Sequence, residues 1–230
     1  TEMIIPVGQW VMKQAFAQCA KWRRKYGEFN ISINISYIQL KDRSIIQKVI
    51  DAAKEADLPG NAITLEVTES MQLQDYNYFN SMFYYWKEKG MQISIDDFGT
   101  GYSSLSYLKG LEVDEVKIDR CFVRQIHKSS YNYRLLSNML KLTQEAQIRV
   151  CCEGVEEEEE LRCLDTLSPE LIQGYFFGKP MPAEEFEEKC LSTEGSYNEF
   201  VSELRQRYQE QPNAVQMPES STVENLEYKT

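Results

Sequence analysis

Two adjacent carboxylates, Asp96 and Asp97, end the apolar segment QISI. Other apolar segments of similar length also carry a polar side chain near their C-terminal ends, namely Asn34, Glu66, Lys117 and Glu153. Carboxylate and amide oxygens are ligands for hard divalent cations such as Mg²⁺ and Mn²⁺. Carboxylates gathered in one cleft repel one another unless cations neutralise them. These residue types therefore predict a divalent-metal site that can hold a phosphate ester.

The side chains of these segments alternate between apolar and polar, as expected of strands with two different faces. The candidate strands are 31–36, 62–68, 91–97, 115–119, 148–153 and 171–176. In the first five, one face is aliphatic, and the other ends in Asn34, Glu66, Asp96, Lys117 and Glu153. Asp97 has the opposite parity from Asp96, but it is the last strand residue, where the backbone can turn its side chain toward the others.

Helical patterns separate the strands, and strands that alternate with helices indicate parallel βαβ units. Such units build either a doubly wound sheet or a (β/α) barrel. A doubly wound sheet would bury the polar rows against apolar helices, which is costly. A barrel turns one face inward and forms its active site at the C-terminal ends of its strands. We therefore predict a TIM-like (β/α) barrel. The sequence has no GxGxxG or GxxxxGK[ST] motif that would indicate a dinucleotide site or a P-loop.

Apolar stripes at helical spacing predict three helices. The first stripe ends at Gly27, has Trp10 beside it, and consists of Val7, Val11, Ala15, Cys19 and Trp22. The other two stripes are Phe79, Met82, Phe83 and Trp86, closed by Gly90, and Leu135, Leu136, Met139 and Leu140. Ser44 and Ser130 are expected to be helix N-caps.

The alternating pattern fades after about Pro182. We expect residues 1–194 to form the barrel domain and residues 195–230 to contain an amphipathic helix and a polar tail. The apolar positions of that helix are Tyr197, Phe200, Val201, Leu204 and Tyr208.

The composition excludes several functional classes. Of the 230 residues, 42% are hydrophobic and 27% are charged, as in an ordinary globular protein. The formal net charge of -11 argues against binding of DNA or RNA polymers, which relies on basic surface. The single histidine, His127, argues against histidine-based triads and histidine-rich metal centres. Six cysteines without a CxxC pair indicate reduced thiols in the cytoplasm, and no apolar run has the length of a membrane span.

Several longer motifs carry a family resemblance. They are SINIS at 32–36, LEVTES at 65–70, DDFGTGYSSLSYL from residue 96, KIDR at 117–120, EGVE at 153–156 and QGYFFGKP at 173–180. In this order and over residues 1 to about 187, the chain resembles the EAL domain family. The resemblance implies a bacterial TIM-like barrel that hydrolyses cyclic di-GMP to linear pGpG with two Mg²⁺ or Mn²⁺ ions.

The resemblance also implies roles for individual residues. The implied metal ligands are Asn34, Glu66, Asp96, Asp97 and Glu153, with Lys117 contacting the nucleophilic water or the phosphate. Glu156 and Gln173 would support the metal site and the ligand. Glu69 would hold a loop that couples the site to a homodimer interface, and this loop consists of Phe98, Gly99, Thr100 and Gly101.

One part of the family pattern is missing. The family takes its name from an upstream Glu-Ala-Leu strand that supplies a metal ligand, and this sequence contains no such segment. Six strands are expected where a closed barrel needs eight, so we expect the first two to be absent. Either the chain comes from a longer protein, which could be membrane-anchored, or it is a degenerate relative. The intact later motifs favour the first explanation.

Three functions are therefore open. The chain is a cyclic di-GMP phosphodiesterase domain, a non-catalytic cyclic di-GMP receptor, or a dimerisation module that has lost the nucleotide.

Overall fold

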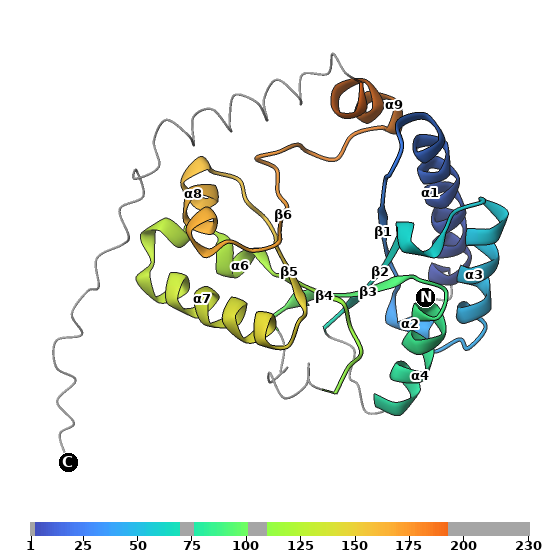
Figure 1. Ribbon diagram of the computed structural model, residues 1–230, viewed down its shortest axis with the longest axis horizontal. Helices are drawn as coiled ribbons and strands as arrows, with labels where there is room; N and C mark the ends of the chain where they lie inside the picture. The colour runs from blue at the N-terminus through green and yellow to red at the C-terminus, as the bar shows by residue number, and fades with distance from the viewer. Residues whose placement is uncertain (1–2, 70–75, 101–109, 193–230) are drawn as a thin grey trace.

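The computed structural model describes residues 3–69, 76–100 and 110–192 (Figure 1). Six strands alternate with helices along the chain: β1 (Ile31–Asn34), β2 (Ile63–Thr68), β3 (Gln92–Phe98), β4 (Glu115–Ile118), β5 (Arg149–Cys152) and β6 (Leu171–Ile172). The longer helices are α1 (Ile4–Tyr26), α3 (Ile45–Glu55), α4 (Tyr76–Lys87), α7 (Ser130–Glu145) and α8 (Glu158–Leu167). Shorter helical segments are α2 (Tyr37–Leu40), η1 (Gly60–Ala62), α6 (Arg120–Val123), η2 (Ile126–Lys128), α9 (Ala183–Phe186) and η3 (Glu187–Leu191).

The strands form one parallel sheet in the order β1-β2-β3-β4-β5-β6, so that each strand pairs with its neighbours in sequence. Helices α1, α3 and α4 lie on one side of the assembly, and α7 and α8 lie on the other (Figure 1). A parallel sheet that keeps its strands in sequential order is the arrangement of a (β/α) barrel, and here it forms an open part of one. The predicted TIM-like α/β fold is confirmed. In the described residues the sheet contains six strands, with β1 and β6 at its edges.

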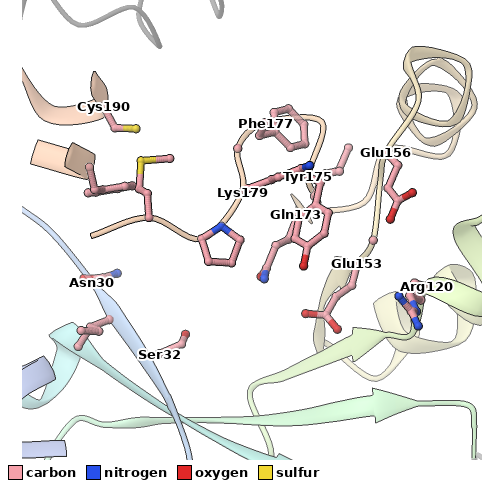
Figure 2. Close-up of a pocket in the computed structure, with 18 of the residues that line it drawn as sticks. Asn30, Ser32, Arg120, Glu153, Glu156, Gln173, Tyr175, Phe177, Lys179 and Cys190 are labelled. Carbon is pink, nitrogen blue, oxygen red and sulfur yellow. The ribbon is translucent and has the colours of Figure 1, made fainter. Parts of the chain in front are cut away.

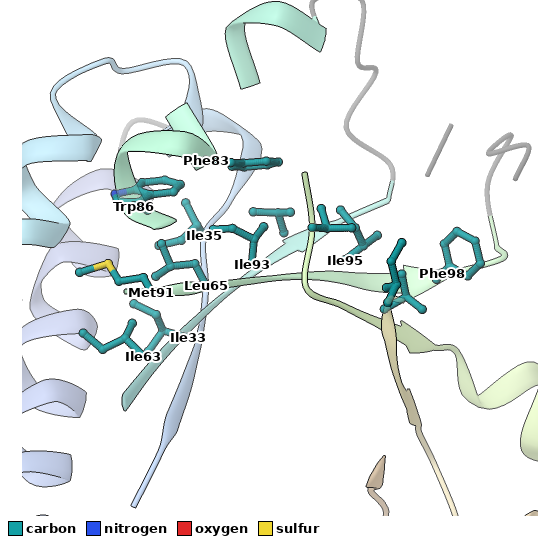
Figure 3. Packing of buried hydrophobic residues seen from close by; sticks show 14 of the residues in the cluster. Ile33, Ile35, Ile63, Leu65, Phe83, Trp86, Met91, Ile93, Ile95 and Phe98 are labelled. Atoms are coloured by element: carbon teal, nitrogen blue, oxygen red, sulfur yellow. The ribbon is translucent and has the colours of Figure 1, made fainter. Parts of the chain in front are cut away.

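The aliphatic strand face packs against the helices, as the alternation predicted. Leu65 on β2 and Ile93 on β3 are fully buried in a cluster with Phe83 and Trp86 of α4 (Figure 3). The predicted stripe on α4 is therefore the buried face of that helix. Leu136, Met139 and Leu140 of α7 are buried as well, while Leu135 packs at the margin of the same core.

The opposite strand face carries a layer of polar side chains that lies before the strand ends. These side chains form hydrogen bonds and ion pairs with one another. Arg149 Nη2 donates to Gln92 Oε1 at 2.9 Å and pairs with Glu115 Oε2 at 3.2 Å. Ser94 Oγ, which is fully buried, donates to Glu115 Oε1 at 3.0 Å. Buried polar groups are tolerated when they are paired in this way, which explains how polar rows fit inside the sheet.

The predicted burial of α1 was partly wrong. Val7 and Val11 are exposed by 47% and 46%, and the inward face of the helix is formed by Met12, Phe16, Cys19, Ala20 and Trp22. The predicted end of the helix at Gly27 is confirmed, since its φ of +91° is a conformation that favours glycine.

One of the two predicted N-caps was wrong. Helix α7 is capped by Ser129, whose hydroxyl accepts from the backbone N–H of Asn132, and Ser130 is the first helical residue. Ser44 is the N-cap residue of α3, as predicted, but its hydroxyl donates to Asp42 Oδ2 at 2.6 Å and makes no capping hydrogen bond. Both helices begin where the sequence indicated, with a different side-chain contact at the start.

Several expectations lie outside the described residues. The amphipathic helix and tail expected over 195–230 belong to this part of the chain, and so does Gly101. Within the ranges that the structure describes, no helix has the length and apolar character needed to cross a membrane.

Candidate active site

Lys117 lies at the centre of the predicted polar cluster, on the buried strand β4. Its ammonium is 2.7 Å from Glu153 Oε1, 3.1 Å from Glu66 Oε2 and 3.3 Å from Asp96 Oδ1. Asn34 joins the cluster from β1, because its amide donates to Glu66 Oε2 at 3.3 Å. The five side chains predicted at the polar ends of five strands are thus brought together.

Strand register explains this convergence. Asn34 pairs with Glu66 across β1 and β2, Thr68 pairs with Asp96 across β2 and β3, and Lys117 pairs with Cys151 across β4 and β5. Side chains of one parity on adjacent parallel strands point to the same side of the sheet. Polar residues near the C-terminal ends therefore meet over the concave face.

The electrostatics of the cluster follow from burial and charge. Burial opposes the charge on Lys117, but the hydrogen bond to Glu153 and the carboxylates of Glu66 and Asp96 outweigh it and raise its pKa. Burial also raises the pKa of Glu153, and Lys117 only partly offsets this effect. Lys117 therefore keeps its positive charge among three closely spaced carboxyl groups.

Asp97 reaches the site by a change of backbone conformation. Its φ is +56°, and the pairing of β3 with β4 shifts register between Ile95 and Phe98. This irregularity turns the exposed Asp97 side chain into the wall of the cavity at the strand ends, although its strand parity is opposite to that of Asp96. Burial raises the pKa of Asp97, and the nearby carboxylates Asp96 and Asp119 raise it further.

The segment after Asp97 is held by Glu69. The buried Glu69 carboxylate accepts from the backbone N–H of Gly99 at 2.5 Å, and the hydroxyl of Thr100 donates to the carbonyl of Asp97 at 2.9 Å. Gly99 has a φ of +96°, and a Cβ there would lie 2.6 Å from the ring of Phe122. The predicted contact between Glu69 and this loop is present, while its link to a dimer interface stays a prediction.

A cavity of about 1220 Å³ opens beside the cluster. Glu153 belongs to both, and the predicted ligand-supporting residues Glu156 and Gln173 also line the cavity (Figure 2). Figure 2 shows Glu153, Gln173 and Tyr175 grouped on one side of this space, with Asn30 and Ser32 across from them. The space is large enough for a molecule of nucleotide size.

Sequence reasoning missed most of the cavity wall. The residues that were not anticipated include two cations and several aromatic rings: Arg120, Lys179, Tyr175, Trp22, Phe29 and Phe186. The motifs KIDR and QGYFFGKP contain three of them, so their positions in those motifs were the available signal. Trp22 and Phe29 carry no such signal, because only the fold brings them next to residues about 150 positions later.

The donor chemistry of the cluster fits a hard divalent cation, since Asn34, Glu66, Asp96, Asp97 and Glu153 offer only oxygen ligands of the preferred kind. The positions of these side chains, in contrast, do not group around a metal position. In residues 3–69, 76–100 and 110–192, no group of three or more His, Cys, Asp or Glu side chains is placed to hold a metal ion. Lys117 instead supplies the positive charge between the carboxylates.

The fold and site together define a barrel-type domain with an acidic, lysine-centred pocket at its strand ends. The chain belongs to the EAL domain family, whose model matches residues 1–180. It is similar to "Cyclic di-GMP phosphodiesterase PdeR" of Escherichia coli (strain K12), with 36% identity over 185 residues, which are 80% of this chain and 28% of that protein. The chain thus spans less than a third of the length of this curated relative.

Solved structures share the fold as well. The "PaMucR Phosphodiesterase, c-di-GMP complex" matches with a TM-score of 0.76 and 35% identity over 81% of this chain and 76% of that one. The "Klebsiella pneumoniae BlrP1 pH 9.0 manganese/cy-diGMP complex" matches with a TM-score of 0.72 and 28% identity over 78% of this chain and 46% of that one.

Proposed function

We propose that this chain is a metal-dependent phosphodiesterase domain that hydrolyses cyclic di-GMP to linear pGpG. The observation that carries the proposal is the Lys117 cluster, in which strand-end acids from three strands meet one lysine beside a nucleotide-sized cavity. The names of the relatives support the substrate, because a phosphodiesterase complex with c-di-GMP and a manganese complex with the same nucleotide share this fold.

The residues have distinct roles in the proposed reaction. Asn34, Glu66, Asp96, Asp97 and Glu153 would hold two Mg²⁺ or Mn²⁺ ions, which would supply an activated water and neutralise the charge of the attacked phosphodiester. Lys117 contacts the attacking water or the phosphate through its ammonium. The carboxylate of Glu153, whose pKa is raised by burial, accepts a proton from that water.

The surrounding residues orient the ligand. Glu156 and Gln173 line the cavity on the side of Glu153 and support the nucleotide there. Glu69 and the loop of Phe98, Gly99, Thr100 and Gly101 couple the site to a homodimer interface. We place the domain in the cytoplasm, where this soluble nucleotide is available to it.

The alternative function is a non-catalytic cyclic di-GMP receptor, which would bind the nucleotide in the same cavity beside the Lys117 cluster without cleaving it.

Turnover distinguishes the two functions. The purified chain is incubated with cyclic di-GMP and Mn²⁺ or Mg²⁺, and pGpG is quantified by chromatography, with EDTA and Asp96→Asn as controls. We expect pGpG in the presence of metal, and we expect none with EDTA or with the isosteric Asp96→Asn variant, which keeps the fold. Metal-dependent turnover by Asp96→Asn would contradict the role of Asp96.

Calorimetry measures whether the chain binds cyclic di-GMP, with and without metal. Binding of cyclic di-GMP without turnover supports the receptor function. No binding with or without metal removes both nucleotide functions and leaves a dimerisation module.

A further inference from the structure

One carboxylate joins the C-terminal described segment to the first helix. Glu187 in η3 accepts hydrogen bonds from Lys25 Nζ at 2.5 Å, Tyr26 Oη at 3.0 Å and Trp22 Nε1 at 3.1 Å. Lys21 adds a longer ion pair at 3.9 Å. These four residues all belong to the last turns of α1, so the Glu187 side chain links η3 to that helix.

An aromatic cluster lies beside this contact. The ring centroids of Trp22 and Phe29 are 5.1 Å apart, and those of Trp22 and Phe186 are 5.3 Å apart. The same three rings line the cavity next to the candidate active site, together with Cys190 and Leu191 of η3. The contact at Glu187 therefore anchors residues that form part of the cavity wall.

The contact at Glu187 joins two segments that are far apart in the sequence. The segment Ala183–Leu191 follows β6 along the chain, yet it lies against α1, which precedes β1 (Figure 1). Strands β1 and β6 are the two edges of the sheet, and no strand pairing joins them in the part of the chain that the structure describes. In Figure 2, Cys190 and Glu153 lie on opposite sides of the cavity. The contact at Glu187 thus lies beside the cavity, between the last described segment and α1.

We propose that Glu187 is a positioning residue that holds Ala183–Leu191 against α1 and thereby sets the wall of the ligand cavity opposite Glu153. Loss of the Glu187 carboxylate releases this wall and weakens ligand binding, while the Lys117 cluster keeps its geometry. The ligand part of the proposal rests on the proposed function, in which the cavity receives cyclic di-GMP. The role of Glu187 in holding Ala183–Leu191 against α1 does not depend on that function.

The first experiment measures the wall directly through the reactivity of a thiol. Cys190 lines the cavity and is partly buried, Cys121 is exposed, and the remaining thiols are buried: Cys19, Cys151, Cys152 and Cys163. In a Cys121→Ser background, a thiol reagent therefore reports mainly on Cys190. We expect Glu187→Ala to raise the labelling rate about tenfold, because the segment opens more often.

Two further variants make this result specific. Glu188→Ala removes the adjacent, exposed carboxylate and should leave the labelling rate unchanged. Glu187→Gln keeps an acceptor for Trp22 and Tyr26 but loses the charge, so we expect an intermediate rate and a stable fold. An unchanged rate in both Glu187 variants overturns the proposal.

The second experiment measures the ligand. We expect Glu187→Ala to raise the Kd or KM for cyclic di-GMP about fivefold and to leave kcat unchanged, because the released wall contributes to binding. A fall in kcat with an unchanged KM overturns the positioning role. If the wild-type chain does not bind cyclic di-GMP, the proposed function fails, and the role of Glu187 in holding the wall is decided by the thiol rates alone.

Discussion

At the level of single residues, the most informative feature is the charge balance around Lys117. The lysine and the acids Glu66 and Asp96 are at most 16% exposed at their side chains, so water screens their interaction weakly. A buried cluster of this kind is costly to break, because removal of one partner leaves uncompensated charges.

Lys117→Met should destabilise the metal-free protein strongly. The substitution leaves three carboxylates facing one another without a cation, and we expect a loss of about 3–5 kcal/mol in the free energy of unfolding. Urea denaturation in EDTA measures it. Addition of Mn²⁺ should restore part of the loss, because a divalent ion then supplies the missing charge.

The matched control is Lys48→Met. Lys48 forms a partly exposed ion pair with Asp42 at 2.9 Å, and its loss should cost about 0–1 kcal/mol. Equal losses in the two variants would show that the Lys117 cluster contributes no more than a surface pair.

The residue types of this cluster were predictable from the sequence, because strand parity selects which side chains share a face. Asp97 shows the limit of that rule. Parity places it on the wrong face, and only its left-handed backbone conformation, with φ of +56°, brings it to the cavity. Sequence alternation contains no information on such a local turn, although Asp is among the residues that tolerate it.

At the level of elements, strand positions were predicted to within a few residues, and the largest error was at the end of the sheet. The expected strand 171–176 is reduced to Leu171–Ile172. Gly174 explains the early end, because the chain turns there against the backbone of Val155. The burial of α1 was mispredicted for another reason: its sequence contains two overlapping apolar stripes, and periodicity alone does not decide which one faces the sheet.

Gly174→Ala should disturb this turn. An added Cβ would overlap the backbone nitrogen and carbonyl oxygen of Val155, which bond to Gln173 and Phe176. We expect a loss of about 1–3 kcal/mol on urea denaturation. Gly178→Ala is the control, since its Cβ would lie 3.6 Å from Met181, an ordinary contact, and a comparable loss there would contradict the explanation.

The start of α7 provides a second prediction at this level. Ser129→Ala removes the hydroxyl that accepts from Asn132 and should lower the free energy of unfolding by about 1 kcal/mol. Ser130→Ala changes the neighbouring serine, which is already helical, and should have little effect. Thermal or urea unfolding of both variants measures the two effects. A larger loss of stability in Ser130→Ala than in Ser129→Ala would show that Ser130 caps the helix.

At the level of the whole molecule, the cavity combines residues from both ends of the described chain. Trp22 and Phe29 come from the first thirty residues, and Phe186 and Cys190 come from the last ten. No local pattern predicts this pairing, because it depends on the curvature of the whole sheet. The order of the strands was predictable from the βαβ pattern, whereas the closing contact between α1 and η3 was not.

The contact between α1 and η3 should depend on pH. Hydrogen bonds from Lys25, Trp22 and Tyr26 lower the pKa of Glu187 to about 2 from an ordinary value of 4.5. A lowered carboxylate pKa means that the contribution to stability is fully present above about pH 4.5 and is lost as pH falls through about 2. Lys21, Lys25 and Tyr26 are the titratable groups that face it from α1.

Unfolding curves of wild type and Glu187→Ala measured between pH 6 and pH 2 test this dependence. Other carboxylates titrate equally in both proteins, so the difference in their free energies of unfolding isolates Glu187. We expect the difference to be constant at higher pH and to shrink in the acidic range. A difference that grows as the pH falls has the wrong sign for the assigned contact.

The two edges of the sheet have a consequence for the behaviour of the protein in concentrated solution. Unpaired backbone groups on an edge strand are a template for association with another chain. The edge strands β1 and β6 have four and two residues, and the longest strands, β2 with six and β3 with seven, lie in the interior of the sheet. The folded chain therefore offers few positions for edge-to-edge aggregation. The long apolar segments of β2 and β3 become available for fibril-like stacking only after the interior of the sheet has unfolded.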